Sequence, residues 1–490
     1  MPTFVAGGLV FTTSAAVLVL EILAARLLAP YVGSSLETYS GVIGTVLAGI
    51  ALGTWAGGRL ADRIDPHRLV GPLLVVGGAL AATSVPVVRG LGAASTAQGA
   101  DVLLLSVCGF LPAAAVLSAV SPVVVKIQLR DLSMTGQVVG RLSALGTAGA
   151  IAGTVLAGFV LIEAAPTSTT VYVIGGLLVV GGVVAWALLD RVRPGPAASA
   201  AVVVLAAVGL GALVGDPCQA ETTYHCARIE VDPDRPSGRL LRLDTLRHSY
   251  VDLEDPTHLE FAYVKLFAAA VDAGLPDATA VDALHVGGGA LTVPRWLEAT
   301  RPGSRSDVLE IDGELVEMVL DRLPPGPEVV LDVAVGDARV LIEDVSTASQ
   351  DVVFGDAFAG LAAPWHLTTE EFVAEVHRAL RPGGLYAVNL IDRPPLRFSR
   401  AEAATFAAVF DHVALVAPPE TLDGAGSANV VLLGSDRPLA VEALRREVAR
   451  RGLDHRVLVG EELEDLVDGA PVLSDDYAPV DQWLLENRRR

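Results

Sequence analysis

The sequence predicts a two-part chain, with an N-terminal polytopic α-helical membrane bundle followed by a C-terminal α/β domain of Rossmann-like, nucleotide-binding type. Three observations support this. The 490 residues are 52% hydrophobic and only 19% charged, and the mean hydropathy of +0.52 is too high for an ordinary soluble enzyme. Most charged residues follow Asp216. After that point, short apolar runs alternate with helical segments.

The region 1–215 is expected to form about seven transmembrane helices, because a bilayer core needs roughly 20 mostly apolar residues of helix. The first segment is no cleavable signal peptide, since it carries Glu21 and Arg26 and lacks a basic start. The expected spans are Phe4–Ala29, Tyr39–Ala61, Leu69–Val88, Asp101–Val125, Val138–Ile162, Thr170–Leu189 and Ala197–Val214.

One carboxylate lies within the first expected span. Glu21 precedes Arg26 by five residues, and a charge in hydrocarbon is costly unless it faces the bundle interior or a polar partner. A structural ion pair and a substrate contact both fit this position.

Positive charge predicts the orientation of the bundle in the lipid bilayer. Basic residues follow the second, fourth and sixth spans, whereas the alternate connections offer little beyond Arg89. This bias puts the N-terminus in the cytoplasm of a multi-pass cell-membrane protein. Seven spans would then deliver the C-terminal domain to the outer face, where Cys218 and Cys226 could form a short disulfide or remain two thiols.

A lead-in over residues 216–275 separates the bundle from the main α/β domain, which is expected over 276–490. Strand-like alternation at Ala227–Val231 and Arg239–Leu243 flanks a turn-rich stretch and predicts a small β-hairpin. A helix is expected over His258–Ala273.

The α/β domain is expected to be a doubly wound parallel sheet. Its predicted strands are Ala280–Val286, Asp307–Ile311, Val329–Val333, Asp351–Phe354, Leu385–Leu390, His412–Val416 and Val430–Gly434. Its predicted helices are Val293–Ala299, Glu314–Arg322, Ala338–Val345, Thr369–Leu380, Glu402–Phe410 and Val441–Arg451.

Glycines and acids stand where the first four strands end, which is where such sheets bind ligands. They are Gly287, Gly288 and Gly289, then Glu310 and Asp312, then Asp337 and Ala338, and finally Asp356. The glycines let backbone approach a ligand at a helix N-terminus, and an acid about twenty residues later can accept both hydroxyls of a ribose. Asp337 suits an adenine amino group, or alternatively a helix N-cap.

These motifs resemble the S-adenosylmethionine methyltransferase-type Rossmann domain of the spermidine synthase (polyamine aminopropyltransferase) superfamily. With the apolar region in front, the whole chain is similar to membrane-fused spermidine synthase-like proteins. The resemblance rests on Gly287–Gly289, Leu309–Asp312, Gly336-Asp337, Asp356 and Leu380–Gly384, on Glu221–Tyr224, Arg239–Asp244 and Tyr263, and on Ser474–Pro479.

The resemblance implies an aminopropyltransferase of polyamine biosynthesis, in which decarboxylated S-adenosylmethionine is the co-substrate, a small-molecule amine is the acceptor and no metal is needed. Glu310 would bind the ribose, Asp337 would bind the adenine, and Gly287–Gly289 would flank the methionine-derived tail. Asp312 and Ala338 would also belong to the cofactor-binding residues. Asp356 would help to deprotonate the attacking ammonium. The amine site would be lined by Tyr224, His225, Asp244 and Tyr263.

The chain departs from the family pattern at three positions. Ala290 stands where family members carry an acid after the glycines, Ala359 replaces a second acid after Asp356, and His225 replaces a glutamine. Two alternatives therefore stand beside the aminopropyltransferase. One is an S-adenosylmethionine-dependent methyltransferase, and the other is a non-catalytic or transporter-like membrane protein with an extracytoplasmic ligand-binding domain.

The charge of the chain bears on its partners. A formal net charge of -21 and a pI near 4.8 argue against a nucleic-acid partner, which would require a basic face. The sequence does not decide between a monomer and a homo-oligomer.

Overall fold

The computed structural model describes residues 1–33, 36–94, 99–129, 131–190, 206–211, 213–275, 280–358, 360 and 362–486. The chain divides into two compact units. The first contains Met1–Arg228 and Leu243–Leu246, and the second contains Ile229–Arg242 and Arg247–Arg490.

The first unit is built from helices, six of which within the described ranges are long and apolar enough to cross a membrane. Broken stretches such as α4 to α6 form one such span. The helices are α1 (Thr3–Val32), α2 (Leu36–Arg63), α3 (Val70–Gly92), α4 (Gly99–Gly109), α5 (Leu111–Ser118), α6 (Val120–Gln128), α7 (Thr135–Leu156), the π-helical turn η3 (Ala157–Leu161), α8 (Ile162–Ala164) and α9 (Thr167–Asp190), with short 3-10 turns η1 (Pro66–Arg68) and η2 (Leu132–Met134).

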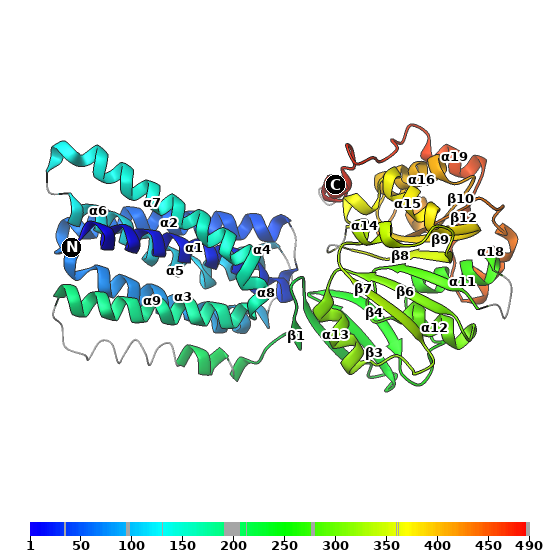
Figure 1. The fold of residues 1–490 in the computed structure, drawn as a ribbon, viewed down its shortest axis with the longest axis horizontal. Helices are drawn as coiled ribbons and strands as arrows, with labels where there is room; N and C mark the ends of the chain where they lie inside the picture. Colours follow the sequence, from blue (N-terminus) through cyan, green and yellow to red (C-terminus); the bar gives the residue numbers. More distant parts are fainter. Residues whose placement is uncertain are drawn as a thin grey trace. The chain divides into compact units, whose positions relative to one another are not determined.

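Small residues allow the helices of this unit to pack closely. Helix α7 runs along α1, and α9 runs along α3 (Figure 1). Gly149 and Gly153 of α7 are buried and face the backbone of Phe11 and Ala15 in α1. Membrane helices associate by this kind of tight packing.

Six of the seven expected spans match these helices. The seventh, Ala197–Val214, falls largely outside the described residues, although 206–211 are helical.

In α1, Arg26 donates to the backbone carbonyls of Thr222 and Thr223, each at 2.5 Å, and Oε2 of Glu21 has no hydrogen-bond partner within the described part of the chain. Arg26 is therefore not the ion-pair partner of Glu21.

The lead-in is larger than the expected hairpin. It forms a four-stranded sheet in the order β1-β2-β3-β4, comprising β1 (Ala220–Glu221), β2 (Cys226–Val231), β3 (Gly238–Leu243) and β4 (Leu246–Asp252). The expected hairpin is present as β2 and β3. The sequence did not indicate β1 and β4, because β1 is only two residues long and β4 carries polar residues such as Arg247 and His248, which mask its alternation.

The main sheet has eight strands in the order β12-β10-β11-β9-β8-β5-β6-β7. All seven strands expected from the sequence are present, and β12 was missed. The strands are β5 (Asp282–Val286), β6 (Arg305–Glu310), β7 (Val330–Val335), β8 (Gln350–Gly355), β9 (Leu380–Asp392), β10 (His412–Ala417), β11 (Ala428–Ser435) and β12 (Arg456–Leu458).

The sheet is mixed rather than entirely parallel. Strands β5 to β9 pair in parallel, whereas β11 pairs antiparallel with β9 and β10, and β10 pairs antiparallel with β12. The expectation of an all-parallel sheet was wrong for this edge, because apolar strand patterns do not encode strand direction.

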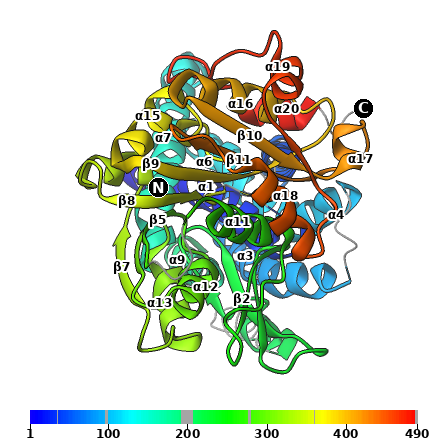
Figure 2. The same cartoon turned by 90° about the vertical axis from the view of Figure 1, so that its right-hand side faces the viewer.

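Helices cover both faces of the sheet, as Figure 2 shows. On one face, α15 and α16 pack against β9, and on the other face α11 packs against β9 and β11 beside α18. The helices of this unit are α11 (Ala262–Gly274), α12 (Thr292–Thr300), α13 (Gly313–Arg322), α14 (Ala338–Leu341), α15 (Glu370–Ala379), α16 (Arg397–Val409), α17 (Pro419–Leu422), α18 (Val441–Arg450), α19 (Glu461–Val467) and α20 (Val480–Glu486), with 3-10 turns η4 (Ile342–Asp344) and η5 (Trp365–Leu367).

The strand order creates a switch point at β5. The chain proceeds outward from β5 to β6 and β7, then returns to β8 on the other side of β5. Connections at such a point diverge and leave a crevice at the carboxyl ends of the strands, where α/β proteins bind ligands.

Candidate active site

The glycine turn follows β5 at this switch point. Gly287 and Gly289 adopt positive φ angles of 95° and 50°, which only glycine adopts without strain. A β-carbon on Gly287 would lie 2.5 Å from the carbonyl oxygen of Asp356. The turn is therefore restricted to glycine both by its conformation and by the strand beside it.

Two hydroxyl groups hold the end of the turn. The Ser249 hydroxyl accepts a hydrogen bond from the backbone N–H of Ala290 at 3.2 Å and lies 3.1 Å from the hydroxyl of Thr292. Thr292 in turn donates to the carbonyl of Tyr250. These contacts join the turn and the start of α12 to strand β4.

Glu310 ends β6 and lies against the glycine turn. Its Oε2 accepts a hydrogen bond from the N–H of Gly288 at 2.7 Å, and its Oε1 accepts from the N–H of Asp312 at 3.0 Å. The carboxylate is thus oriented by backbone and keeps unused lone pairs on both oxygens. Asp312 is buried, and its carboxylate caps α13 by accepting from the N–H of Leu315.

Asp337 follows β7 and caps α14. Its carboxylate accepts from the N–H of Arg339 at 2.9 Å, so the N-cap interpretation of this residue holds in the structure. The same oxygen lies 3.3 Å from Nε2 of His366 in turn η5. Ala338, beside it, is buried.

Asp356 follows β8, and its carboxyl group is held by two side chains. It accepts a hydrogen bond from the Asn389 amide at 2.9 Å and is hydrogen-bonded to the Tyr263 hydroxyl. Burial raises the pKa of Asp356 to about 6, the two hydrogen bonds oppose that rise, and the nearby charge of Glu310 adds to it. Such a carboxyl is ionised at neutral pH but binds a proton much more readily than an ordinary aspartate.

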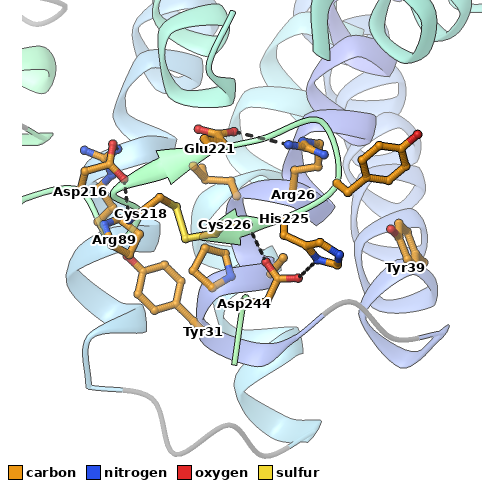
Figure 3. Close-up of a pocket in the computed structure, with 15 residues that line it drawn as sticks. Arg26, Tyr31, Tyr39, Arg89, Asp216, Cys218, Glu221, His225, Cys226 and Asp244 are labelled. Carbon is orange, nitrogen blue, oxygen red and sulfur yellow. Dashed lines mark hydrogen bonds and ion pairs between the residues drawn. A yellow bond between two sulfur atoms is a disulfide. The ribbon is translucent and has the colours of Figure 1, made fainter. Parts of the chain in front are cut away.

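The residues expected at the amine site fall into two groups. Tyr263 lies on α11 in the second unit, in contact with Asp356. Tyr224, His225 and Asp244 lie in the first unit. The Asp244 carboxylate accepts from the N–H of Cys226 at 3.0 Å and lies 3.3 Å from Nδ1 of His225 (Figure 3), while the Tyr224 side chain is exposed.

A small polar pocket surrounds His225 and Asp244, and two arginines from the helices line it (Figure 3). Arg26 lies 4.0 Å from Glu221, which also caps α9 by accepting from the N–H of Thr167 at 2.8 Å. Arg89 forms an ion pair with Asp216 at 2.7 Å. The charged groups of the pocket therefore neutralise one another and fasten the lead-in strand β1 to α1 and α9.

A disulfide joins Cys218 and Cys226 next to this pocket (Figure 3). Of the two alternatives left open by the sequence, the structure therefore contains the bonded pair. Cys108 is a free thiol.

Sequence reasoning missed several polar residues around the site, namely Ser249, Thr292, His366, Asn389 and Asn429. One signal was available, because Asn389 interrupts the apolar run Leu385–Leu390. Of the two alanines that depart from the family pattern, Ala290 is buried and Ala359 lies outside the described residues. No group of three or more His, Cys, Asp or Glu side chains among the described residues is arranged to hold a metal ion.

Comparisons with known proteins agree with this geometry. A family of S-adenosyl-L-methionine-dependent methyltransferases matches residues 317–388. A polyamine aminopropyltransferase of Vibrio vulnificus (strain CMCP6) is 31% identical over 163 residues, or 33% of this chain and 52% of that protein. The chain thus spans about half the length of this curated relative.

A solved structure matches over nearly its whole length. The crystal structure of a probable spermidine synthase from Corynebacterium glutamicum ATCC 13032 is 31% identical, with a TM-score of 0.50, and the match covers 53% of this chain and 97% of that one. These relatives support a function of aminopropyltransferase or methyltransferase type with a substrate derived from S-adenosylmethionine. The chain belongs to the spermidine synthase-like family.

Proposed function

We propose that this chain is a membrane-bound aminopropyltransferase that transfers an aminopropyl group from decarboxylated S-adenosylmethionine to a polyamine or related small amine. The observation that carries the proposal is Asp356, whose backbone lies against Gly287 of the glycine turn and whose carboxyl group, held by Asn389 and Tyr263, has a pKa raised to about 6. A general base works best when its pKa lies near the working pH.

The proposed reaction needs one proton acceptor and no metal. The substrate ammonium gives a proton to Asp356, and the freed nitrogen lone pair attacks the aminopropyl carbon bonded to the donor's sulfonium. A C–N bond forms, the C–S bond breaks, and its electron pair stays on sulfur, so neutral methylthioadenosine leaves. The product leaves as a secondary ammonium ion, and Asp356 returns to its ionised form by releasing the proton it accepted to solvent.

Donor binding is assigned to the groups at the ends of β5, β6 and β7. Glu310, oriented by two backbone N–H groups, keeps lone pairs for the ribose hydroxyls. Asp337 keeps one oxygen that neither Arg339 nor His366 contacts, and this oxygen suits the adenine amino group. Tyr263 borders the acceptor amine because it contacts Asp356.

A second candidate is methyl transfer from S-adenosylmethionine itself, and the surroundings of Ala290 favour it. Ala290 brings no acid to hold a cationic donor tail. Its carbonyl lies 3.4 Å from Nε of Arg295, a buried guanidinium bonded only to backbone carbonyls within the described residues. With alanine at position 290, a donor that retains its carboxylate meets no like charge from this residue.

Calorimetry on the purified full chain separates these candidates. The aminopropyltransferase proposal expects decarboxylated S-adenosylmethionine and methylthioadenosine to bind at least ten times more tightly than S-adenosylmethionine. The reverse order would support the methyltransferase. Absence of binding by all three would refute both and leave a non-catalytic domain.

We also propose that the apolar helices cross the cell membrane with the N-terminus inside and the α/β domain outside. Positive charge supports the inside position of the N-terminus. The outward position of the domain requires the seventh expected span, Ala197–Val214, in which 206–211 are helical, and it is supported by the disulfide, because disulfides persist in oxidising compartments. Reporters fused after Arg490 test it. A signal from an enzyme active only in the cytoplasm would overturn the orientation and would place the domain where cytoplasmic nucleosides are available.

A further inference from the structure

Two asparagine side chains, Asn389 and Asn429, are linked to Asp356 by hydrogen bonds, and the proposed reaction uses neither of them. The side-chain nitrogen of Asn389 donates to Oδ1 of Asp356 at 2.9 Å, and the side-chain oxygen of Asn389 accepts from the side-chain nitrogen of Asn429 at 2.9 Å. Asp356 directly follows β8, Asn389 lies in β9 and Asn429 lies in β11, and these three strands are neighbours in the sheet. They form a continuous line of hydrogen bonds that ends on the carboxyl group.

The strand register explains how the two asparagines meet. Strands β9 and β11 pair antiparallel, with Asn389 opposite Val431 and Asn429 opposite Ile391. Asn429 is thus two residues from the partner of Asn389, so both side chains project from the same face as diagonal neighbours. Asn389 is 3% exposed in an otherwise apolar stretch of β9. An amide buried there is costly unless its groups are bonded.

The donor from Asn429 determines which way the Asn389 amide faces. An asparagine side chain has an acceptor oxygen on one side and a donor nitrogen on the other. With its oxygen engaged by Asn429, Asn389 must present its nitrogen to Asp356. A flipped amide would present an oxygen to Asp356, and two oxygens can share a hydrogen bond only when the carboxyl group is protonated.

The charge on Asp356 depends on few other groups. The Tyr263 hydroxyl on α11 also favours the ionised form, whereas burial and the carboxylate of Glu310 on β6 favour the protonated form. A change in one donor should therefore be visible in the titration of this residue.

We propose that Asn429 is a positioning residue, which acts through Asn389 to keep the Asp356 carboxyl group in its ionised, proton-accepting state. This inference rests on the proposed role of Asp356 as the proton acceptor. Asn429 itself touches neither Asp356 nor, in this proposal, the substrate.

The test compares two substitutions of similar size in the full-length protein. Asn429→Leu removes the donor, and Asn429→Gln retains an amide that can donate. In Asn429→Leu, the acidic limb of the pH-rate profile should move upward by up to about one pH unit, because Asn389 keeps its amide but loses the partner that orients it, and loss of a whole hydrogen bond to a charged group sets the upper limit. Asn429→Gln should restore the profile of the parent, and Asn389→Leu should shift it at least as far as Asn429→Leu.

A second readout needs no activity. Each protein is compared with the same protein carrying Asp356→Asn in addition. The difference between their two melting temperatures, followed from pH 4 to pH 9, reports the titration of Asp356 directly. The inflection should lie higher for Asn429→Leu than for the parent and for Asn429→Gln. Identical inflections in all three proteins would overturn the positioning role, even if Asp356 proves essential. A shifted inflection in a protein without transferase activity would support the relay and refute the proposed function.

Discussion

Replacing Asp356 with asparagine should stabilise the protein while abolishing its reaction. The pKa of this carboxyl rises from 3.8 to about 6 on folding, mainly because of burial. Since each pKa unit is worth about 1.4 kcal/mol, the ionised side chain costs the folded state at most about 3 kcal/mol. Partial exposure and the rearranged bonds to Asn389 and Tyr263 should reduce the observed gain to about 1–3 kcal/mol.

The sign of the pH dependence follows from the raised pKa. Below about pH 4 the group is protonated in both the folded and the unfolded chain, so it carries no penalty. As the pH rises from about 4 to about 6, the unfolded chain loses its proton first, and stability falls until the folded group is ionised as well. The asparagine variant lacks this fall.

Thermal unfolding at pH 4 and pH 8 measures the effect. Asp356→Asn should melt several degrees above the parent at pH 8, at roughly 2–4 °C per kcal/mol, and within a degree or so of it at pH 4. Asp411→Asn, the same change at an exposed position, should melt like the parent at both. An Asp356→Asn variant that is less stable than the parent at pH 8 would refute the account in which burial destabilises the ionised Asp356 carboxyl group.

Three further predictions concern other parts of the structure. Gly287→Ala should lower the free energy of unfolding by about 1–3 kcal/mol, because its φ of 95° strains an L-residue, and it should weaken methylthioadenosine binding; denaturant unfolding at parental stability would contradict this. Glu310→Gln should weaken methylthioadenosine binding at least tenfold in calorimetry. Each oxygen of Glu310 accepts from a backbone N–H group, and glutamine has only one acceptor oxygen for these two N–H groups and the ribose hydroxyls. Unchanged affinity would exclude Glu310 from the donor site. Cys218→Ser should cost about 2–3 kcal/mol, since the disulfide closes a loop with a sequence separation of 8; Cys108→Ser is the control, and equal melting temperatures of the two variants would show that the disulfide is absent in the isolated protein.

The sequence predicted the positions of the acids proposed for the donor site because of a simple property of α/β sheets. Strands that alternate with helices pair in parallel and end at one edge of the sheet, so Glu310, Asp337 and Asp356 could be placed at that edge from the alternation of expected strands and helices. The sequence did not separate binding from capping. Asp312 and Asp337 both cap helices, and a capping acid and a ligand-binding acid look alike after a strand.

Other features depended on pairing that the sequence does not display. The fifth strand was expected to begin at Leu385, but β9 begins at Leu380, which pairs with Gln350, while Leu385 pairs with Val352 across an irregularity. Asn389 and Asn429 are 40 residues apart, and only the antiparallel register of β9 and β11 brings them together. Long-range pairing of this kind is set by the tertiary fold and not by local pattern.

The central claim is that Asp356 accepts the proton in an aminopropyl transfer. The most direct measurement is mass spectrometry of the purified full chain incubated at pH 8 with decarboxylated S-adenosylmethionine and a panel of small diamines. The account predicts equimolar methylthioadenosine and an amine heavier by one aminopropyl group, with formation of both reduced at least a hundredfold in Asp356→Asn. Parental rates in that variant, or a methylated product formed only from S-adenosylmethionine, would contradict it.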